Sequence, residues 1–285
     1  MVFLAVSGGR IIGILPDVPH CTGLQLLYRQ KPMHRIKEAA ENSQLRLAPQ
    51  QISPYPFGKD CHSRSDMITA NYDIARYNMA YQQIRPWDVW DDLVLDVMQE
   101  LPREQFVPHA YRSLAFADTR IPLGHGELMM EPKMEARMLQ ALAVNPSDQV
   151  LEIGTGSGFV TACLARLGNA VSSYDIHDDF IQSAEEKLAM QGINNVHLNL
   201  GNGFTAELPK EGFDVIAVTG SLPEYSDKYE QFLAPGGRLF MVVGGSPVME
   251  AMLITRHGEE FIQDHLFETD LPPLKLLPQP SRFSF

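Results

Sequence analysis

Cysteine is scarce in this sequence: there are three among 285 residues, and none is spaced as a CxxC or other metal-ligand pair. A disulfide framework and a zinc site are therefore not expected, and we predict no bound metal. Long apolar runs are also missing, since no stretch approaches the roughly 18 to 20 residues that cross a bilayer. The first residues lack the pattern of a signal peptide. We expect a cytoplasmic protein with no membrane partner.

Positive charge is in short supply as well. Lys and Arg number 23 against 35 for Asp and Glu, which gives a net charge of −12. Such a balance opposes attraction to nucleic-acid phosphates, so no nucleic-acid partner is expected. Apolar residues make up 45% and charged residues 20%, which is close to ordinary globular usage. We therefore predict a folded globular protein, neither disordered nor a coiled coil, and expect it to be a monomer.

The first 66 residues differ from the remainder. Basic residues outnumber acidic ones there, hydrophobic periodicity is weak, and residues 48–66 are rich in Pro, Ser and Gly, as loops are. We predict an irregular N-terminal extension over residues 1–66 and one domain over residues 67–285. Two interpretations stay open: the extension is an accessory segment, or Met67 is the start of the working protein and the extension is not part of it.

From Met67 onward the pattern indicates helices and then alternating strands and helices. A helix is expected at Trp90–Leu101 with Asp88 as its cap, and another opens at Pro132. The strands expected after it are 150–153, 170–174, 196–200, 213–219 and 238–243, with helices at 159–167, 179–191 and 225–233. Continuous apolar strands separated by helices are typical of a parallel sheet covered on both faces.

The last part of the chain changes character. Residues 251–255 and 260–267 flank His257-Gly258, a reasonable hairpin turn. The predicted fold class is therefore α/β: a doubly wound, mostly parallel Rossmann-like sheet with a C-terminal antiparallel hairpin.

Three glycines, Gly154, Gly156 and Gly158, stand where a buried strand turns into a helix. Glycine permits the sharp turn and lets a ligand approach the main chain. Phe159 occupies the position where a GxGxxG dinucleotide fingerprint needs glycine, which favours an adenosine ligand without a pyrophosphate. Asp175 follows the next strand, at the roughly 20-residue offset of an acid that binds ribose hydroxyls. The alternative is that the glycines only form a turn and Asp175 caps a helix.

These residues resemble a known family. The run VLEIGTGSG with Asp175, the GNG at 201–203, the strand FDVIAVTG and the PGGRL turn are similar to class I S-adenosylmethionine-dependent methyltransferases. More specifically, the chain from about residue 75 resembles the protein-L-isoaspartate O-methyltransferase family. That family carries a D-x-x-x-P-x-G-x-G loop upstream, which Asp118, Pro122, Gly124 and Gly126 match; Pro132 and Met134 match the residues that follow.

The resemblance implies a methyltransferase domain with a helical N-terminal part and substrate loop at 67–131 and a cofactor-binding core at 132–285. It also implies S-adenosyl-L-methionine as cofactor. In the family the glycine loop holds the methionine part, the acid holds the ribose, and residues near GDG contact the adenine. The cofactor residues implied here are Glu152, Gly154, Thr155, Gly156, Ser157, Gly158, Asp175, Ile176, Asn202, Gly203 and Thr219. Asn202 replaces the usual Asp, but its amide oxygen still accepts a hydrogen bond.

The acceptor side departs further from the family. Its loop typically reads G-x-G-Q-T-I-S-x-P, and here Glu127 replaces Gln while Leu128 and Met130 replace the Thr and Ser hydroxyls. Glu127 is expected to repel an anionic acceptor. The candidate catalytic residues are Asp118, Thr119, His125 and Met130, the last at the position of the family's Ser. As a lone loop histidine, His125 also has a purely structural interpretation.

The function implied by the resemblance is methyl transfer from S-adenosylmethionine to an isoaspartyl carboxylate in damaged proteins, with an isoaspartyl protein or peptide as partner. A carboxylate is ionised at pH 7 and needs no general base. Thr219 and Ser221 either contact the acceptor or cap the next helix. Three alternatives stay open: methyl transfer to another acceptor, cofactor binding without turnover and, least favoured, a nicotinamide oxidoreductase.

Overall fold

The computed structural model describes residues 3–7, 10–15 and 64–277, and the chain divides into two compact units at Met1–Lys59 and Asp60–Phe285. In the first unit, β1 (Phe3–Ser7) and β2 (Arg10–Leu15) form an antiparallel pair. The prediction of an irregular extension is wrong for these two strands. Their signal was present, since two apolar runs flank a Gly-Gly pair in the sequence. Residues 16–63 lie outside the described part of the chain.

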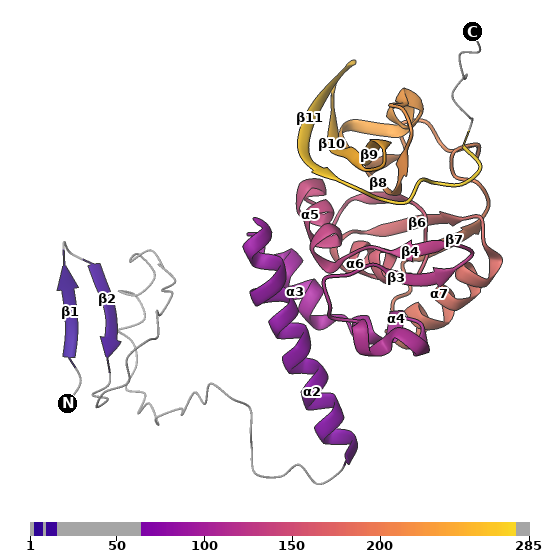
Figure 1. Ribbon diagram of the computed structural model, residues 1–285. Helices are drawn as coiled ribbons and strands as arrows, with labels where there is room; N and C mark the ends of the chain where they lie inside the picture. The colour runs from indigo at the N-terminus through magenta and orange to yellow at the C-terminus, as the bar shows by residue number, and fades with distance from the viewer. Residues whose placement is uncertain (1–2, 8–9, 16–63, 278–285) are drawn as a thin grey trace. The chain divides into compact units, whose positions relative to one another are not determined.

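The second unit is built on a seven-stranded sheet with the order β11-β10-β9-β8-β5-β6-β7 (Figure 1). Its strands are β5 (Gln149–Ile153), β6 (Ala170–Asp175), β7 (Val196–Leu200), β8 (Phe213–Leu222), β9 (Leu233–Gly245), β10 (Val248–His257) and β11 (Glu260–Thr269). Neighbours from β7 to β9 pair in parallel, whereas β9–β10 and β10–β11 are antiparallel. The predicted α/β fold with a mostly parallel sheet and a C-terminal antiparallel hairpin is confirmed.

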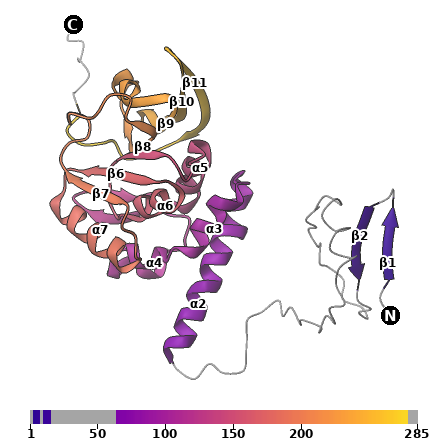
Figure 2. The same cartoon turned by 180° about the vertical axis from the view of Figure 1, so that it is seen from behind.

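Helices cover one face of this sheet. α2 (Arg64–Asn78) begins three residues before the predicted boundary and continues into a π-helical turn, η2 (Met79–Ile84), and a 3-10 turn, η3 (Arg85–Trp87). The remaining α-helices are α3 (Asp92–Glu100), α4 (Arg103–Phe106), α5 (Pro132–Leu142), α6 (Phe159–Leu167) and α7 (Asp178–Met190). α3, α5 and α6 share one buried cluster with the strands beneath them, and Figure 2 shows α6 and α7 from behind. Burial of this apolar face is the main stabilising contribution.

The opposite face has a smaller core around Leu151, Ile216 and Tyr229. It is covered by residues 201–212 and by a 3-10 helix, η5 (Asp227–Phe232), which Ser226 caps at Lys228 N. The helix predicted at 225–233 is present, but as this shorter 3-10 helix. β8 continues through Leu222 and β9 begins at Leu233, so the last residue of the predicted helix belongs to a strand.

Two further expectations near α3 are corrected. Asp91, not Asp88, caps the helix: its carboxylate accepts a hydrogen bond from Leu93 N at 2.9 Å, while Asp88 has a left-handed backbone with φ 63°. Trp90, expected on the buried face, is 64% exposed. The helix begins after Trp90, so this side chain precedes the helical stripe. The segment predicted as a substrate loop follows a 3-10 helix, η4 (His109–Leu114), and contains a hairpin of β3 (Ile121–Gly124) and β4 (Glu127–Met129).

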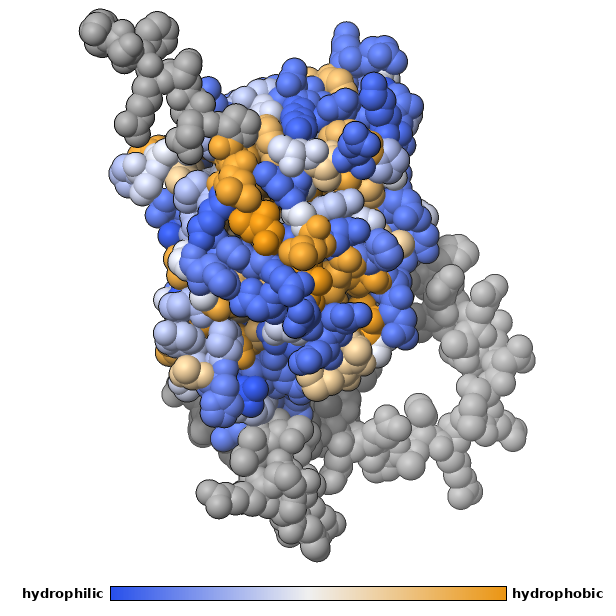
Figure 3. Space-filling model, turned by 90° about the vertical axis from the view of Figure 1, so that its right-hand side faces the viewer, coloured by the Kyte–Doolittle hydropathy of each residue, from blue (hydrophilic) through white to orange (hydrophobic). Residues whose placement is uncertain are grey.

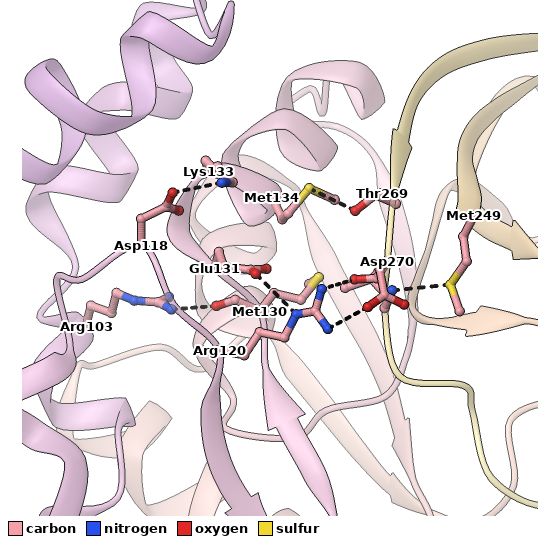
Figure 4. A network of polar contacts seen from close by, with 11 residues as sticks. Arg103, Asp118, Arg120, Met130, Glu131, Lys133, Met134, Met249, Thr269 and Asp270 are labelled. Carbon is pink, nitrogen blue, oxygen red and sulfur yellow. Dashed lines mark hydrogen bonds and ion pairs between the residues drawn. The ribbon is translucent and has the colours of Figure 1, made fainter. Parts of the chain in front are cut away.

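A buried arginine joins the helical layer to this hairpin. Arg103 is fully buried and donates to Ala115 O at 2.9 Å and to Met130 O at 2.8 Å (Figure 4). Its third contact is an ion pair with Glu135, on α5. The guanidinium also lies over the ring of Phe159, 4.7 Å from the centroid. Burial raises the pKa of Glu135 to about 7 in spite of Arg103, because desolvation disfavours the charged carboxylate.

Removing Arg103 is expected to leave Glu135 as an unpaired buried acid. Arg103→Met should lower the free energy of unfolding by about 3–5 kcal/mol at pH 8. The loss should be smaller at pH 5.5, since without the arginine the pKa of Glu135 rises further and the carboxyl is neutral there. Urea unfolding at both pH values, with exposed Arg112→Met as control, measures this. Equal losses at the two pH values would contradict it, as would failure of Arg103→Met/Glu135→Gln to recover stability at pH 8.

Candidate active site

A cavity opens at the carboxyl ends of β5, β6 and β8, where parallel α/β sheets place their ligands. Its volume is about 850 Å³ when space open to solvent is included. β7 lies at the right of Figure 1, and Figure 3 shows apolar side chains gathered on that side within a hydrophilic surround. The cavity therefore sits where the fold predicts a cofactor.

The glycine turn forms one wall. Gly154, Gly156 and Gly158 have φ of 104°, 50° and 81°, a left-handed backbone that favours glycine. At Gly154 a Cβ would also overlap the hydroxyl of Thr219. That hydroxyl donates to Ile153 O at 2.9 Å and to Gly154 O at 2.7 Å. Thr219 therefore supports the turn from β8, the neighbour of β5 in the sheet.

Asp175 ends β6 beside the turn. One carboxylate oxygen accepts from Gly156 N at 2.8 Å and the other from His177 N at 2.9 Å. A carboxylate has about four acceptor positions, so two remain for the hydroxyls of a ribose. The arrangement of a buried acid beside an open glycine turn therefore fits an adenosine ligand.

Asn202 lies at the same end of the sheet and binds a segment that the sequence did not single out. Its Oδ1 accepts from Phe204 N at 2.9 Å, and its Nδ2 donates to Leu276 O at 3.1 Å. We call residues 270–277 the C-terminal strap; Leu274, Lys275 and Leu277 from it line the cavity. An ionised Asp in place of Asn202 has no donor for the strap carbonyl. The amide thus holds the strap while keeping acceptor capacity toward the cavity.

Of the predicted cofactor residues, nine line the cavity: Gly154, Thr155, Gly156, Ser157, Asp175, Ile176, Asn202, Gly203 and Thr219. Glu152 and Gly158 do not. Gly158 is the residue from which α6 begins. Glu152 is buried below the turn and accepts hydrogen bonds from Thr161 at 2.5 Å and Ser173 at 2.6 Å. Burial raises its pKa to about 8. Ser173 in turn contacts the hydroxyl of Thr155 at 2.6 Å, so Glu152 reaches the turn only through Ser173.

The wall that the hairpin contributes to the cavity is apolar. Leu128, Met129 and Met130 line the cavity, and Met130 is 7% exposed. Asp118 and Thr119, predicted as catalytic, are not in the lining. Asp118 is instead an exposed partner of Lys133 on α5 at 2.8 Å (Figure 4). The Asp118 carboxylate therefore joins the segment before β3 to α5 through an ion pair.

His125 lies at the mouth, outside the lining. Its ring stacks on His177 with centroids 4.1 Å apart and planes 10° from parallel, and its Nε2 is 3.0 Å from a carboxylate oxygen of Asp179. The ligand atoms of these three residues fall within 4.8 Å of one another. An imidazole binds a metal in the plane of its ring, so two parallel rings do not converge on one ion as they lie. The expectation of no metal stays a prediction.

Comparisons with known proteins agree with this geometry. The family of protein-L-isoaspartate(D-aspartate) O-methyltransferases matches residues 78–275. This chain belongs to that family. Protein-L-isoaspartate O-methyltransferase 1 of Rhodopseudomonas palustris (strain HaA2) is 38% identical over 201 residues, 70% of this chain and 82% of that protein. The protein-L-isoaspartate O-methyltransferase of Pseudomonas paraeruginosa (strain DSM 24068 / PA7) is 38% identical over 182 residues, 64% and 86% of the two chains.

Solved structures support the fold. A Plasmodium falciparum chain described as a protein-L-isoaspartate O-methyltransferase, in complex with S-adenosyl-L-homocysteine, has a TM-score of 0.61 and 21% identity. The match covers 70% of this chain and 98% of that one. Within the described residues, no helix of this family member is long and apolar enough to span a membrane.

Two other outcomes concern residues in the site of this methyltransferase-family chain. Ser221 neither caps η5 nor faces the cavity: it is buried, and its hydroxyl donates to Leu271 O of the strap at 2.9 Å. Glu135 lines the cavity but sequence reasoning missed it, because no local pattern marks an acid on an amphipathic helix as buried. Lys275 was missed for a similar reason, since its partners are distant in the sequence.

Glu152 should make stability depend on pH. Its pKa is raised from an ordinary carboxyl value to about 8, so the folded protein holds a proton that the unfolded chain releases. The contribution of this group to folding stability therefore falls as pH rises from about 4.5 to 8, by at most about 1.4 kcal/mol per pH unit. Glu152→Gln should remove that part of the slope and be more stable than the parent at pH 8.

Urea unfolding of the parent and of Glu152→Gln at pH 5, 6.5 and 8 measures the difference in their free energies of unfolding. Glu135 is present in both proteins, so its pH-dependent contribution cancels in this difference. Parallel pH profiles would show that Glu152 is ionised in the folded protein at neutral pH.

Proposed function

We propose that this protein transfers the methyl group of S-adenosyl-L-methionine to the carboxylate of isoaspartyl residues in damaged proteins or peptides. The observation that carries the proposal is one cavity with two unlike walls. The glycine turn and Asp175 form the cofactor wall, and the hairpin residues Leu128 to Met130 form the acceptor wall. Membership of the family adds the reaction class.

The cofactor wall has the groups that this cofactor needs. The backbone of Gly154 to Ser157 is open to the methionine part, Asp175 has free acceptor positions for the ribose, and Asn202 and Gly203 are assigned to the adenine end. When bound, S-adenosylmethionine supplies an electrophilic methyl group on a positively charged sulfur. Asp175 is already held by two backbone amides, so the carboxylate is oriented before the ligand arrives.

The acceptor wall positions the acceptor carboxylate and excludes water from it. An isoaspartyl carboxylate is ionised at pH 7, so no proton has to be removed by the protein. The side chains of Leu128, Met129 and Met130 exclude water, and a carboxylate with less solvation is a better nucleophile. Positioning of the two reacting groups then provides most of the rate. Roles for Asp118 and Thr119 have less support, because neither lines the cavity.

We further propose that the protein acts as a cytoplasmic monomer that binds no nucleic acid. The low cysteine content and the negative charge of the sequence support this setting.

Labelled methyl transfer to an isoaspartyl peptide, beside its aspartyl twin, tests the reaction. We expect base-labile ester on the isoaspartyl peptide alone. Asp175→Ala should bind the cofactor about 10- to 100-fold more weakly, since it loses charge-assisted hydrogen bonds, whereas exposed Asp178→Ala should leave binding and transfer unchanged.

A folded protein that binds cofactor without labelling the isoaspartyl peptide would contradict the proposal. Label on other molecules would then indicate a different acceptor, and no label on any acceptor would indicate a binding protein without turnover.

A further inference from the structure

An ion pair closes the mouth of the cavity between the hairpin and the strap. Lys275 Nζ lies 2.7 Å from Glu127 Oε1 and also donates to the carbonyl oxygen of His125. Both side chains line the cavity, with exposed fractions of 41% for Lys275 and 23% for Glu127. The ammonium group therefore sits on the substrate loop itself.

The strap holds Lys275 in this place through contacts of its own. Ser221 N donates to Pro272 O, and Leu274 N donates to Ser221 O, both at 2.9 Å. At the other end of the strap, Arg120 bridges Asp270 and Glu131 at the end of the hairpin (Figure 4). These contacts fix the backbone of the strap and so hold Lys275 at the opening of the cavity.

Without this lysine the mouth is acidic. Within the part of the chain that the structure describes, Glu127 has one other basic side chain within 4 Å, His177, whose Nε2 is 3.8 Å from the same oxygen, beyond hydrogen-bond distance. Asp179 adds a second carboxylate, which faces His125. An anionic acceptor that approaches these carboxylates is repelled, and repulsion at about 4 Å is substantial near a protein surface.

We infer that Lys275 neutralises Glu127 and so lets an acceptor carboxylate enter the cavity. The inference rests on the proposed function for the identity of the acceptor. Lys275 is a positioning residue in this account, because it acts through Glu127 and not on the reacting atoms. Its effect is electrostatic, and salt should screen it.

Three variants and a binding measurement separate this role from mere support of the strap. The probe is a fluorescent isoaspartyl peptide, titrated by anisotropy in the presence of saturating S-adenosylhomocysteine. Lys275→Met should weaken peptide binding about 3- to 10-fold, and Glu127→Gln should strengthen it by a similar factor. The double variant Glu127→Gln/Lys275→Met should bind within about twofold of the parent, because neither charge is left.

Exposed Lys210→Met, which removes one positive charge elsewhere, should bind as the parent does. The affinity for S-adenosylhomocysteine is measured for each variant, so that every peptide titration is made at saturation of that ligand. At 0.5 M salt the differences should shrink, and in turnover Lys275→Met should raise KM with little change in kcat.

A double variant as weak as Lys275→Met would overturn the inference, since it would mean direct acceptor binding or loss of the strap. Parent-like binding by Lys275→Met, or no peptide binding by the parent, would overturn it too. The proposed function is judged separately by ester formation. A protein that binds the peptide in the predicted charge order but forms no ester would support the inference and contradict the proposed function.

Discussion

The buried guanidinium of Arg103 is the constraint on which the site depends. A charge with no exposed surface must have its donors satisfied by fixed acceptors, and these come from Ala115 O, Met130 O and Glu135. The three acceptors belong to the turn after η4, to the end of the hairpin and to α5. Any movement of the hairpin away from α5 would leave the buried Arg103 guanidinium without one of its acceptors. The acceptor wall therefore has one position relative to the sheet.

The cofactor wall is fixed in a different way, by backbone conformation. The left-handed glycines form a turn that Thr219 supports from β8 and Asp175 supports from β6. The same carboxylate that faces the ribose position also holds Gly156 N. Binding and architecture therefore share one side chain, because an acid that must stay oriented in a buried place is best held by amides that need an acceptor.

Prediction from sequence worked where the physical cause is local. The glycine turn, Asp175 and the parallel strands are contiguous patterns of backbone freedom and apolar periodicity. It failed where the cause is distant. The helix predicted near Tyr225 is a shorter 3-10 helix between β8 and β9, Asp118 pairs with Lys133 on α5, and Glu152 lies beneath the turn it was expected to line. Lys275 was missed because Glu127 lies in the hairpin, far away along the chain.

The departures from the family's pattern are better understood in pairs. Taken alone, Asn202 loses a carboxylate and Glu127 gains one, and both changes look harmful to a site that binds a cation and an anion. In the fold each meets the strap: Asn202 donates to Leu276 O, and Glu127 pairs with Lys275. An amide is the group that can donate to a carbonyl, and a carboxylate is the group that attracts an ammonium. The two substitutions therefore bind one segment, the strap, to the cavity.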